Sequence, residues 1–256
     1  MTMSVAVSKA KIESEIVGRF GDAFRIQEKV AAFTISSGIP ELDALIGGVP
    51  RGAVSEVFGP ASSGRTSLMT AMLAYATTHE EICALVDTND VFAPTTAAAS
   101  GIDFERLLWV RCAANIEHAF KAVDLLLHAG GFGLVVLDLG DVPGKDARRI
   151  ISSWWYRFRR TVENKPTALL VLAEESCTRS CAALTLELSG AAEWSKERKV
   201  QNVVPLHPPK SIVSPLRLSH ANLLQGNSIK VNRHRPITAS VNEAQFKVKN
   251  FLLQAS

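Results

Sequence analysis

The sequence predicts an α/β fold in which a mostly parallel, twisted sheet is flanked by helices, with a helix before it and a basic extension after it. Between residues 36 and 188, short apolar runs of strand character alternate with helical stretches, which is the order that produces parallel strands joined by helices. A glycine-rich turn joins one such run to the next helix. The 47% hydrophobic and 21% charged composition is typical of a globular chain and excludes a disordered one.

The individual elements follow from apolar periodicity. The expected strands are 54–58, 82–86, 107–110, 134–137, 168–172 and 183–188, and the expected helices are 67–77, 116–128 and 146–162. In the last of these helices, the residues predicted to face the sheet are Ile150, Ile151, Trp154, Trp155 and Phe158. After Gly190 five prolines interrupt the chain, so long helices are not expected there.

Three segments are therefore expected: an N-terminal helix and linker (1–34), a core (35–190) and a basic, proline-interrupted extension (191–256). The first segment carries an apolar stripe at four-residue spacing, formed by Ile12, Ile16, Phe20 and Phe24. This stripe packs either on a neighbouring copy or partner, as in oligomerisation, or on the chain's own core. The extension has too little bulk for a core of its own, so it wraps the main core or docks on a partner.

The charge is uneven. Residues 193–256 carry a net charge of +7, so the preceding residues sum to −4. A basic segment beside an acidic core favours contact with nucleic acid or an acidic partner, although a solvated tail has the same composition. Cys83, Cys112, Cys177 and Cys181 have no zinc-binding spacing and are predicted to be reduced thiols of a cytoplasmic protein. No apolar run is long enough to span a membrane.

The chemistry is concentrated in the glycine-rich turn. It fits the phosphate-binding pattern G-x-x-x-x-G-[K]-[ST], except for an arginine in place of lysine, and reads Gly59-Pro60-Ala61-Ser62-Ser63-Gly64-Arg65-Thr66, followed by Ser67. Glycines let backbone N–H groups curl round phosphate oxygens, and the following helix adds its positive end. The Thr66 hydroxyl is expected to ligate Mg²⁺. The alternative is an ordinary tight turn between a strand and a helix.

Two further patterns accompany the loop. Residues 134–137 are four apolar residues followed by Asp138, an acid placed to hold Mg²⁺ through water at the end of a buried strand. Residues 36–52 read S-x-G-x-x-x-L-D-x-x-x-G-G-x-P-x-G and lead into the loop. Together with G-P-x-S-S-G, this order resembles the RecA/RadA recombinases. The resemblance runs from about residue 12 to 188 and includes Phe20-Gly21. It implies a RecA-like P-loop NTPase core, ATP or ADP with Mg²⁺ as cofactor, and a role in DNA repair.

The chain departs from the RecA pattern at the residues that do chemistry. Where the family has Asp-Ala-Glu, this sequence has Asp87-Thr88-Asn89, and an amide cannot act as a general base. Glu174 lies near the place of a glutamine that senses the γ-phosphate, where a carboxylate repels phosphate. With Arg65, these changes predict a chain that hydrolyses ATP poorly or not at all. Nucleotide binding stays open, since the backbone loop, Arg65, Thr66 and Asp138 could still hold a magnesium nucleotide. The loops 139–145 and 174–181 are too short for autonomous strand exchange.

Several arginines are candidates for contact with single-stranded DNA or a partner: Arg148, Arg149, Arg157, Arg159, Arg160, Arg233 and Arg235. In the alternative, the apolar residues of 146–162 face the sheet and the arginines form a solvated surface.

Among RecA-like proteins, the small degenerate chain resembles the ImuA family, accessory factors of bacterial translesion synthesis in the SOS response to DNA damage. That resemblance implies an ImuB-like relative of the Y-family polymerases and a DnaE-type error-prone polymerase as partners, with RecA as a further one. Two other functions remain open: an active RecA/RadA-like DNA-dependent ATPase in homologous recombination, and a SulA-like inhibitor of cell division. All three place the chain in the bacterial cytoplasm, the first two at the nucleoid.

Overall fold

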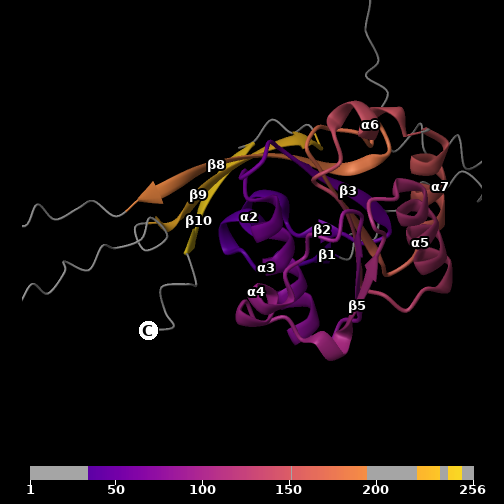
Figure 1. Cartoon of the computed structure of the whole chain (residues 1–256), viewed down its shortest axis with the longest axis horizontal. Helices are drawn as coiled ribbons and strands as arrows, with labels where there is room; N and C mark the ends of the chain where they lie inside the picture. The colour runs from indigo at the N-terminus through magenta and orange to yellow at the C-terminus, as the bar shows by residue number, and fades with distance from the viewer. Residues whose placement is uncertain (1–33, 151, 195–223, 237–241, 250–256) are drawn as a thin grey trace, which may run out of the picture. The chain divides into compact units, whose positions relative to one another are not determined.

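The computed structural model describes residues 34–150, 152–194, 224–236 and 242–249 (Figure 1). The apolar stripe predicted for residues 12–24 lies outside these ranges. None of the helices in the described part of the chain has both the length and the apolar character needed to span a bilayer.

A sheet of eight strands forms the centre of the described chain, in the order β10-β9-β8-β3-β7-β6-β4-β5. The strands are β3 (Ala53–Phe58), β4 (Cys83–Asp87), β5 (Leu107–Arg111), β6 (Leu134–Leu139), β7 (Ala168–Ala173), β8 (Ala182–Trp194), β9 (Leu224–Arg235) and β10 (Glu243–Lys249). Strands β3 to β8 are parallel to one another, β9 pairs antiparallel with β8, and β10 pairs antiparallel with β9. A separate antiparallel pair is formed by β1 (Thr34–Ile35) and β2 (Val49–Pro50). The predicted α/β fold class is confirmed.

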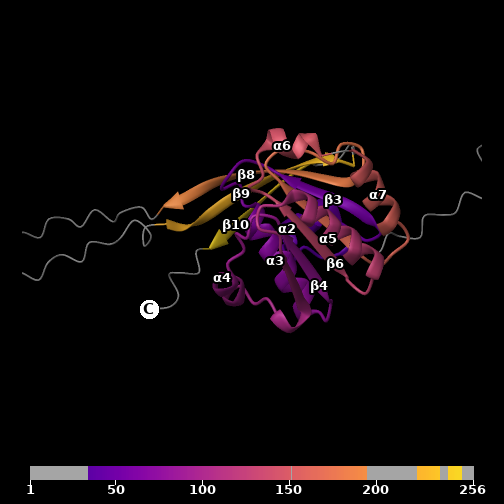
Figure 2. The ribbon, with the colours of Figure 1, turned by 45° about the vertical axis from the view of Figure 1, so that its right-hand side comes forward.

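Helices cover both faces of the sheet (Figures 1 and 2). They are α2 (Pro40–Ile46), α3 (Arg65–Thr78), α4 (Pro94–Ala99), α5 (Ile116–Ala129), α6 (Gly144–Arg149) and α7 (Ser152–Val162), with a 3₁₀ turn at Phe104–Arg106. Side chains of β6 alternate between two cores, Leu134 and Val136 facing α3, and Val135 and Leu137 facing α5 and α7. This alternation is expected for a strand buried on both faces.

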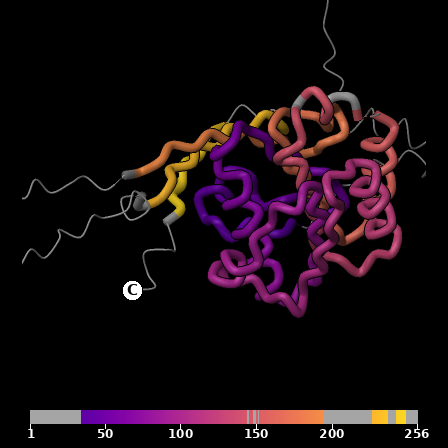
Figure 3. The backbone as a smooth tube through the Cα atoms, in the orientation of Figure 1, coloured from indigo at the N-terminus to yellow at the C-terminus, as the bar shows by residue number. Residues whose placement is uncertain are grey.

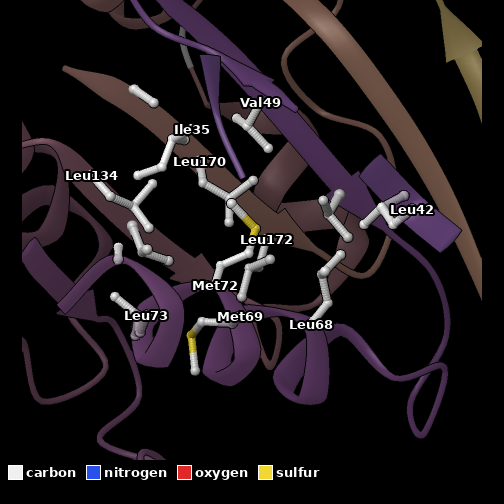
Figure 4. Close-up of a cluster of buried hydrophobic side chains, with 14 of the residues drawn as sticks. Ile35, Leu42, Val49, Leu68, Met69, Met72, Leu73, Leu134, Leu170 and Leu172 are labelled. Carbon is white, nitrogen blue, oxygen red and sulfur yellow. The ribbon is translucent and has the colours of Figure 1, made fainter. Parts of the chain in front are cut away.

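The α3 face of the sheet holds the larger apolar cluster (Figure 4). Leu68, Met69 and Met72 project from α3 toward Leu170 and Leu172 of β7, and all five are at most 1% exposed. Burying side chains of this size contributes roughly 1.5–3 kcal/mol each. The helix that begins at the glycine-rich loop is therefore fixed rigidly on the sheet.

The predicted helix 146–162 is two helices, so that prediction was wrong. Helix α6 ends at Arg149, and Ile150 has the extended backbone angles φ −54° and ψ 125°. Two β-branched isoleucines followed by two serines are weak helix formers, which favours a break at this point. Trp155 and Phe158 are buried against the sheet as expected, and Trp154 and Ile150 are partly buried.

The expected extension contributes two strands to the core sheet. Strand β8 runs four residues past Gly190, and β9 pairs with it along most of its length (Figure 3). Ile229 and Val231 of β9 and Phe246 of β10 lie in the α3-side core. These apolar residues gain burial only by extending an existing sheet, because the segment has no core of its own.

The connection from β7 to β8 is short. Ala173 at the end of β7 pairs with Phe58, whereas Ala182 at the start of β8 pairs with Val54, so residues 174–181 return across the whole of β3. Parallel strands ordinarily require a connection of a dozen or more residues, usually a helix. Here the eight residues 174–181 make the crossing without a helix.

Candidate nucleotide-binding site

The glycine-rich loop connects β3 to α3 at the carboxyl edge of the parallel strands, the edge at which α/β sheets bind ligands. Gly59 donates its backbone N–H to Ala173 O at 3.3 Å, and Ser63 donates to Pro60 O at 3.1 Å. Gly64, with φ +99°, precedes the first residue of α3. This left-handed conformation favours glycine and turns the chain into the helix.

Strands β8 and β9 pack closely beneath the loop. A Cβ at Gly190 would collide with the carbonyl oxygen of Ser62, and a Cβ at Gly64 would collide with the side chain of Ile229. A Cβ at Gly59 would collide with Leu188 O. The shape of the loop therefore depends on strands that the sequence analysis did not connect with it.

Arg65 is buried, with 9% of its surface exposed, and its Nη1 has no hydrogen-bond acceptor among the residues that the structure describes. A methyl group at Gly140 would lie 3.6 Å from the guanidinium carbon of Arg65 and 2.9 Å from Oδ1 of Asp138. The two residues singled out by the sequence patterns therefore converge at Gly140. An unpaired buried N–H is costly, and a phosphate oxygen is a suitable acceptor for it.

Asp138 ends up beside Asp87, its register partner on β4. Its Oδ1 accepts a hydrogen bond from the Gly140 N–H at 2.8 Å. The pKa of Asp138 is raised to about 6, mainly because its surroundings desolvate the carboxylate. The hydrogen bond from Gly140 and the charge of Arg65 lower this pKa, whereas Asp87 and Asp141 raise it. The carboxylate lies in a mainly acidic environment in which Arg65 supplies positive charge.

The fit to a magnesium nucleotide is uneven. The buried hydroxyl of Ser63 and Nη1 of Arg65 both lack hydrogen-bond partners in the described part of the chain, and phosphate oxygens are suitable acceptors for both groups. Thr66, on the first turn of α3 with Ser67, is exposed, and Asp138 is half-buried. Within the described ranges, no three His, Cys, Asp or Glu side chains are grouped so as to hold a metal ion. If Mg²⁺ binds, Thr66 and Asp138 would hold it and it would neutralise phosphate charge.

The two degenerate catalytic positions follow the ends of β4 and β7, the two strands that flank β6. Asn89 is half-buried in the turn that follows β4, and Glu174 is exposed after β7. The carboxylate of Asp90 is held by Arg111 at 3.0 Å and by the backbone N–H of Ala113 at 3.3 Å. Asp90 is thus engaged in fixing the turn rather than oriented as a base.

Glu56, in the middle of β3, was missed by the sequence analysis. It is fully buried and accepts hydrogen bonds from Ser176 Oγ at 2.8 Å, Cys177 N at 2.6 Å and Thr178 N at 2.8 Å. It therefore anchors the short connection from β7 to β8. The one available signal was a carboxylate within the apolar run 53–58.

The arginines predicted to contact DNA or a partner differ in their surroundings: some bind other residues of this chain, and others are exposed. Arg233 donates to Leu45 O at 2.7 Å, which ties β9 to α2, and Arg157 binds both carboxylate oxygens of Asp124. The remaining ones differ in exposure: Arg235 donates to Arg179 O, Arg159 and Arg160 are exposed on α7, and the side chains of Arg148 and Arg149 are outside the described set.

A strand, a glycine-rich loop and a helix, with an acid at the end of a neighbouring parallel strand, define a P-loop protein of the α/β class. Within this class, residues 5–143 match the model of the RecA N-terminal domain, and the chain belongs to the RecA family.

Three curated relatives illustrate the similarity, each named Protein RecA. The chain is 37% identical to that of Rubrobacter xylanophilus over 120 residues, covering 47% of this chain and 34% of the relative. It is 40% identical to that of Nostoc punctiforme and 42% identical to that of Trichodesmium erythraeum, each over 121 residues, 47% of this chain and 32% of the relative. The matched region thus spans about a third of the length of these relatives.

Proposed function

We propose that this RecA-family chain is a non-hydrolysing accessory factor in DNA damage tolerance. The observation that carries the proposal is the absence of a suitable general base in the turn after β4. Asn89 stands where the RecA pattern has its catalytic glutamate, and the adjacent Asp90 is bound to Arg111 and Ala113. An amide cannot take a proton from water, and a carboxylate already paired with a guanidinium is a poor base.

The surface connections favour the same role. The connection from β6 to α6 comprises only residues 140–143, and residues 174–181 are held on β3 by Glu56. In the RecA resemblance these two connections contact DNA in the filament. Short, anchored connections favour action through surface contacts with other proteins over autonomous strand exchange.

The specific role that we propose is the ImuA-like one, in translesion synthesis during the SOS response. The partners would be an ImuB-like relative of the Y-family polymerases and a DnaE-type error-prone polymerase, with RecA as a further partner. Support comes from a RecA core with an altered nucleotide site and altered connections. The exposed arginines 159 and 160 on α7 are candidates for this contact or for weak binding of single-stranded DNA.

ATP turnover tests the first part of the proposal. The purified chain with single-stranded DNA should release no phosphate above a no-protein blank, with an active RecA protein as positive control. DNA-stimulated turnover that disappears in an Asp138→Asn variant would overturn it and identify the chain as an active recombinase.

Association with purified partners tests the second part. Co-elution with an ImuB-like protein is expected, and a double variant Arg159→Glu/Arg160→Glu should weaken it if α7 is the contact. Lys121→Glu on the exposed side of α5 is the matched control. If neither polymerase associates with the intact chain, the translesion role is excluded.

A second function has one observation in its favour. Relatives with about 40% identity are named RecA, and the loop keeps the strand-loop-helix geometry of a phosphate site. An active recombinase is therefore the alternative that the turnover assay decides.

A further inference from the structure

Strand β10 forms one edge of the eight-stranded sheet (Figure 1). It pairs with β9 over all seven of its residues without a register shift, and it contains no proline. Its outer side has no neighbouring strand in the described part of the chain. Natural edge strands are usually short, charged, bulged or interrupted by proline, because a long regular edge is a template for another strand. Strand β10 is thus an open edge with the regularity of a pairing surface.

The backbone groups that face outward from this edge follow from one hydrogen bond. Arg233 donates its backbone N–H to Asn242 O, directly before β10, at 2.7 Å. In an antiparallel pair, residues bonded in this way alternate with residues whose backbone groups point away from the neighbouring strand. The N–H and C=O groups of Glu243, Gln245 and Lys247 therefore point outward, away from β9.

The side chains of these residues lie on one face of the sheet. Phe246 is buried in the core on the α3 side, so its neighbours along β10 face the opposite side. There Glu243 forms an ion pair with Lys230 at 2.9 Å, and Lys247 forms one with Glu193 at 2.7 Å. All four side chains are at least 37% exposed, and ion pairs this exposed contribute little to stability. The two charges of β10 can therefore change partners at little cost.

The order of these charges matches β10 to a second copy of itself. When the strand pairs antiparallel with its own copy about Gln245, Glu243 of each strand lies opposite Lys247 of the other, and Phe246 lies opposite Ala244. Opposite charges then face each other twice across the two-fold axis. A lysine on an edge ordinarily discourages pairing, but in this register it meets a carboxylate. Pairing about Lys247 would instead place two lysines opposite each other.

We propose that two copies of this chain associate through β10, so that their sheets join antiparallel about Gln245 into one continuous sheet. The two-fold symmetry closes this assembly at two copies. The seam comprises one strand from each copy, which is smaller than a standard protein interface, so the dimer should dissociate on dilution. The inference goes beyond the proposed function and depends on neither nucleotide binding nor a polymerase partner.

Sedimentation velocity of the intact chain tests the inference. Between micromolar and near-millimolar concentration, the mass should rise from that of one chain toward that of two. Gln245→Pro should abolish this rise, because the ring removes the outward N–H at the centre of the seam but no hydrogen bond to β9. Thermal unfolding shows whether this variant is folded.

Charge reversal tests the register. Glu243→Lys and Lys247→Glu should each weaken the dimer about tenfold or more, because each change places like charges opposite each other twice. The double variant Glu243→Lys/Lys247→Glu restores opposite charges and should regain the wild-type dissociation constant. Under mild oxidation Gln245→Cys should form disulfide-linked dimers, whereas Ser189→Cys, exposed on β8 and away from the edge, should not.

A chain that stays monomeric at near-millimolar concentration overturns the inference, as does a dimer that Gln245→Pro leaves intact. If the chain is a monomer and Gln245→Pro prevents its association with the ImuB-like protein, the edge belongs to that partner and a second copy is excluded. A double charge variant no tighter than the single variants would overturn the register. None of these results affects the accessory role, because phosphate release and polymerase association judge that role separately.

Discussion

The carboxylate of Glu56 accepts a hydrogen bond from the backbone N–H of Thr178 at 2.8 Å, across 122 positions of sequence. The same Oε1 accepts from Cys177 N at 2.6 Å, and the other oxygen accepts from Ser176 Oγ. Three donors on one buried carboxylate compensate for much of its lost hydration. These hydrogen bonds to Glu56 hold the connection between β7 and β8 against the middle of β3.

Replacing Glu56 by alanine should lower the free energy of unfolding by about 2–4 kcal/mol, because two buried N–H groups lose their acceptor. Glu56→Gln should cost less, since one side-chain oxygen still accepts. Urea denaturation measures both, and amide hydrogen exchange at residues 177 and 178 should accelerate. Glu117→Gln, on the surface of α5, is the control, and its free energy of unfolding should equal that of wild type. An alanine variant as stable as wild type would show that the anchor has no energetic role.

The contact between Gly64 and Ile229 gives a prediction about the loop. Gly64→Ala imposes two penalties: a backbone at φ +99° that costs roughly 1–2 kcal/mol with a side chain, and a collision with Ile229 that adds about 1–3 kcal/mol. Gly47→Ala carries only the first penalty, because its φ is +71° and no atom of the described residues lies within 4 Å of the new Cβ. Denaturant unfolding should therefore rank Gly64→Ala as the more destabilised.

The double variant Gly64→Ala/Ile229→Ala isolates the collision. It should be less destabilised than the sum of the single variants, because the smaller side chain makes room for the new Cβ. Strict additivity would mean that the loop moves away from β9 instead.

Local patterns were sufficient for the parallel core. Strand β3, helix α3 and strand β6 lie within two residues of their predicted bounds, because each has its own apolar periodicity and a clear end signal. The break at Ile150 was missed, since the apolar spacing continues through it. Strands β9 and β10 were missed because their stability comes from pairing with β8, a contact far away in the sequence.

The residues of the candidate site also fall into those that the sequence predicts and those that it does not. Arg65 and Asp138 could be found from the sequence, because the motif fixes their type and spacing. Gly140, Ile229 and Glu56 could not, because their roles arise from register and crossing between strands. The match to the RecA N-terminal domain covers residues 5–143 and includes none of the strands β8 to β10.

The cysteines predict slow chemical labelling. All four are free and buried, and burial raises the pKa of Cys83 to about 12 and the pKa of Cys177 further above its usual range. Because the thiolate is the reactive form, native protein at pH 8 should react with iodoacetamide far more slowly than protein in urea. Mass spectrometry of the alkylated chain measures this. Thr95→Cys, at an exposed position of α4, provides an internal control that should label at once.

Asp138 predicts a pH dependence whose sign follows from its raised pKa. Between about 3.8 and 6 the native state holds this proton more firmly than the unfolded state, so the free energy of unfolding falls as pH rises through that window. The full effect is about 3 kcal/mol and persists at pH 7. Asp138→Asn has no proton to lose and still accepts from Gly140. From pH 3.5 to 7 its stability should therefore rise relative to wild type by that amount, as measured by guanidinium unfolding at each pH. Parallel curves for the two proteins would mean that Asp138 is solvated in solution and that Arg65 faces an ordinary carboxylate.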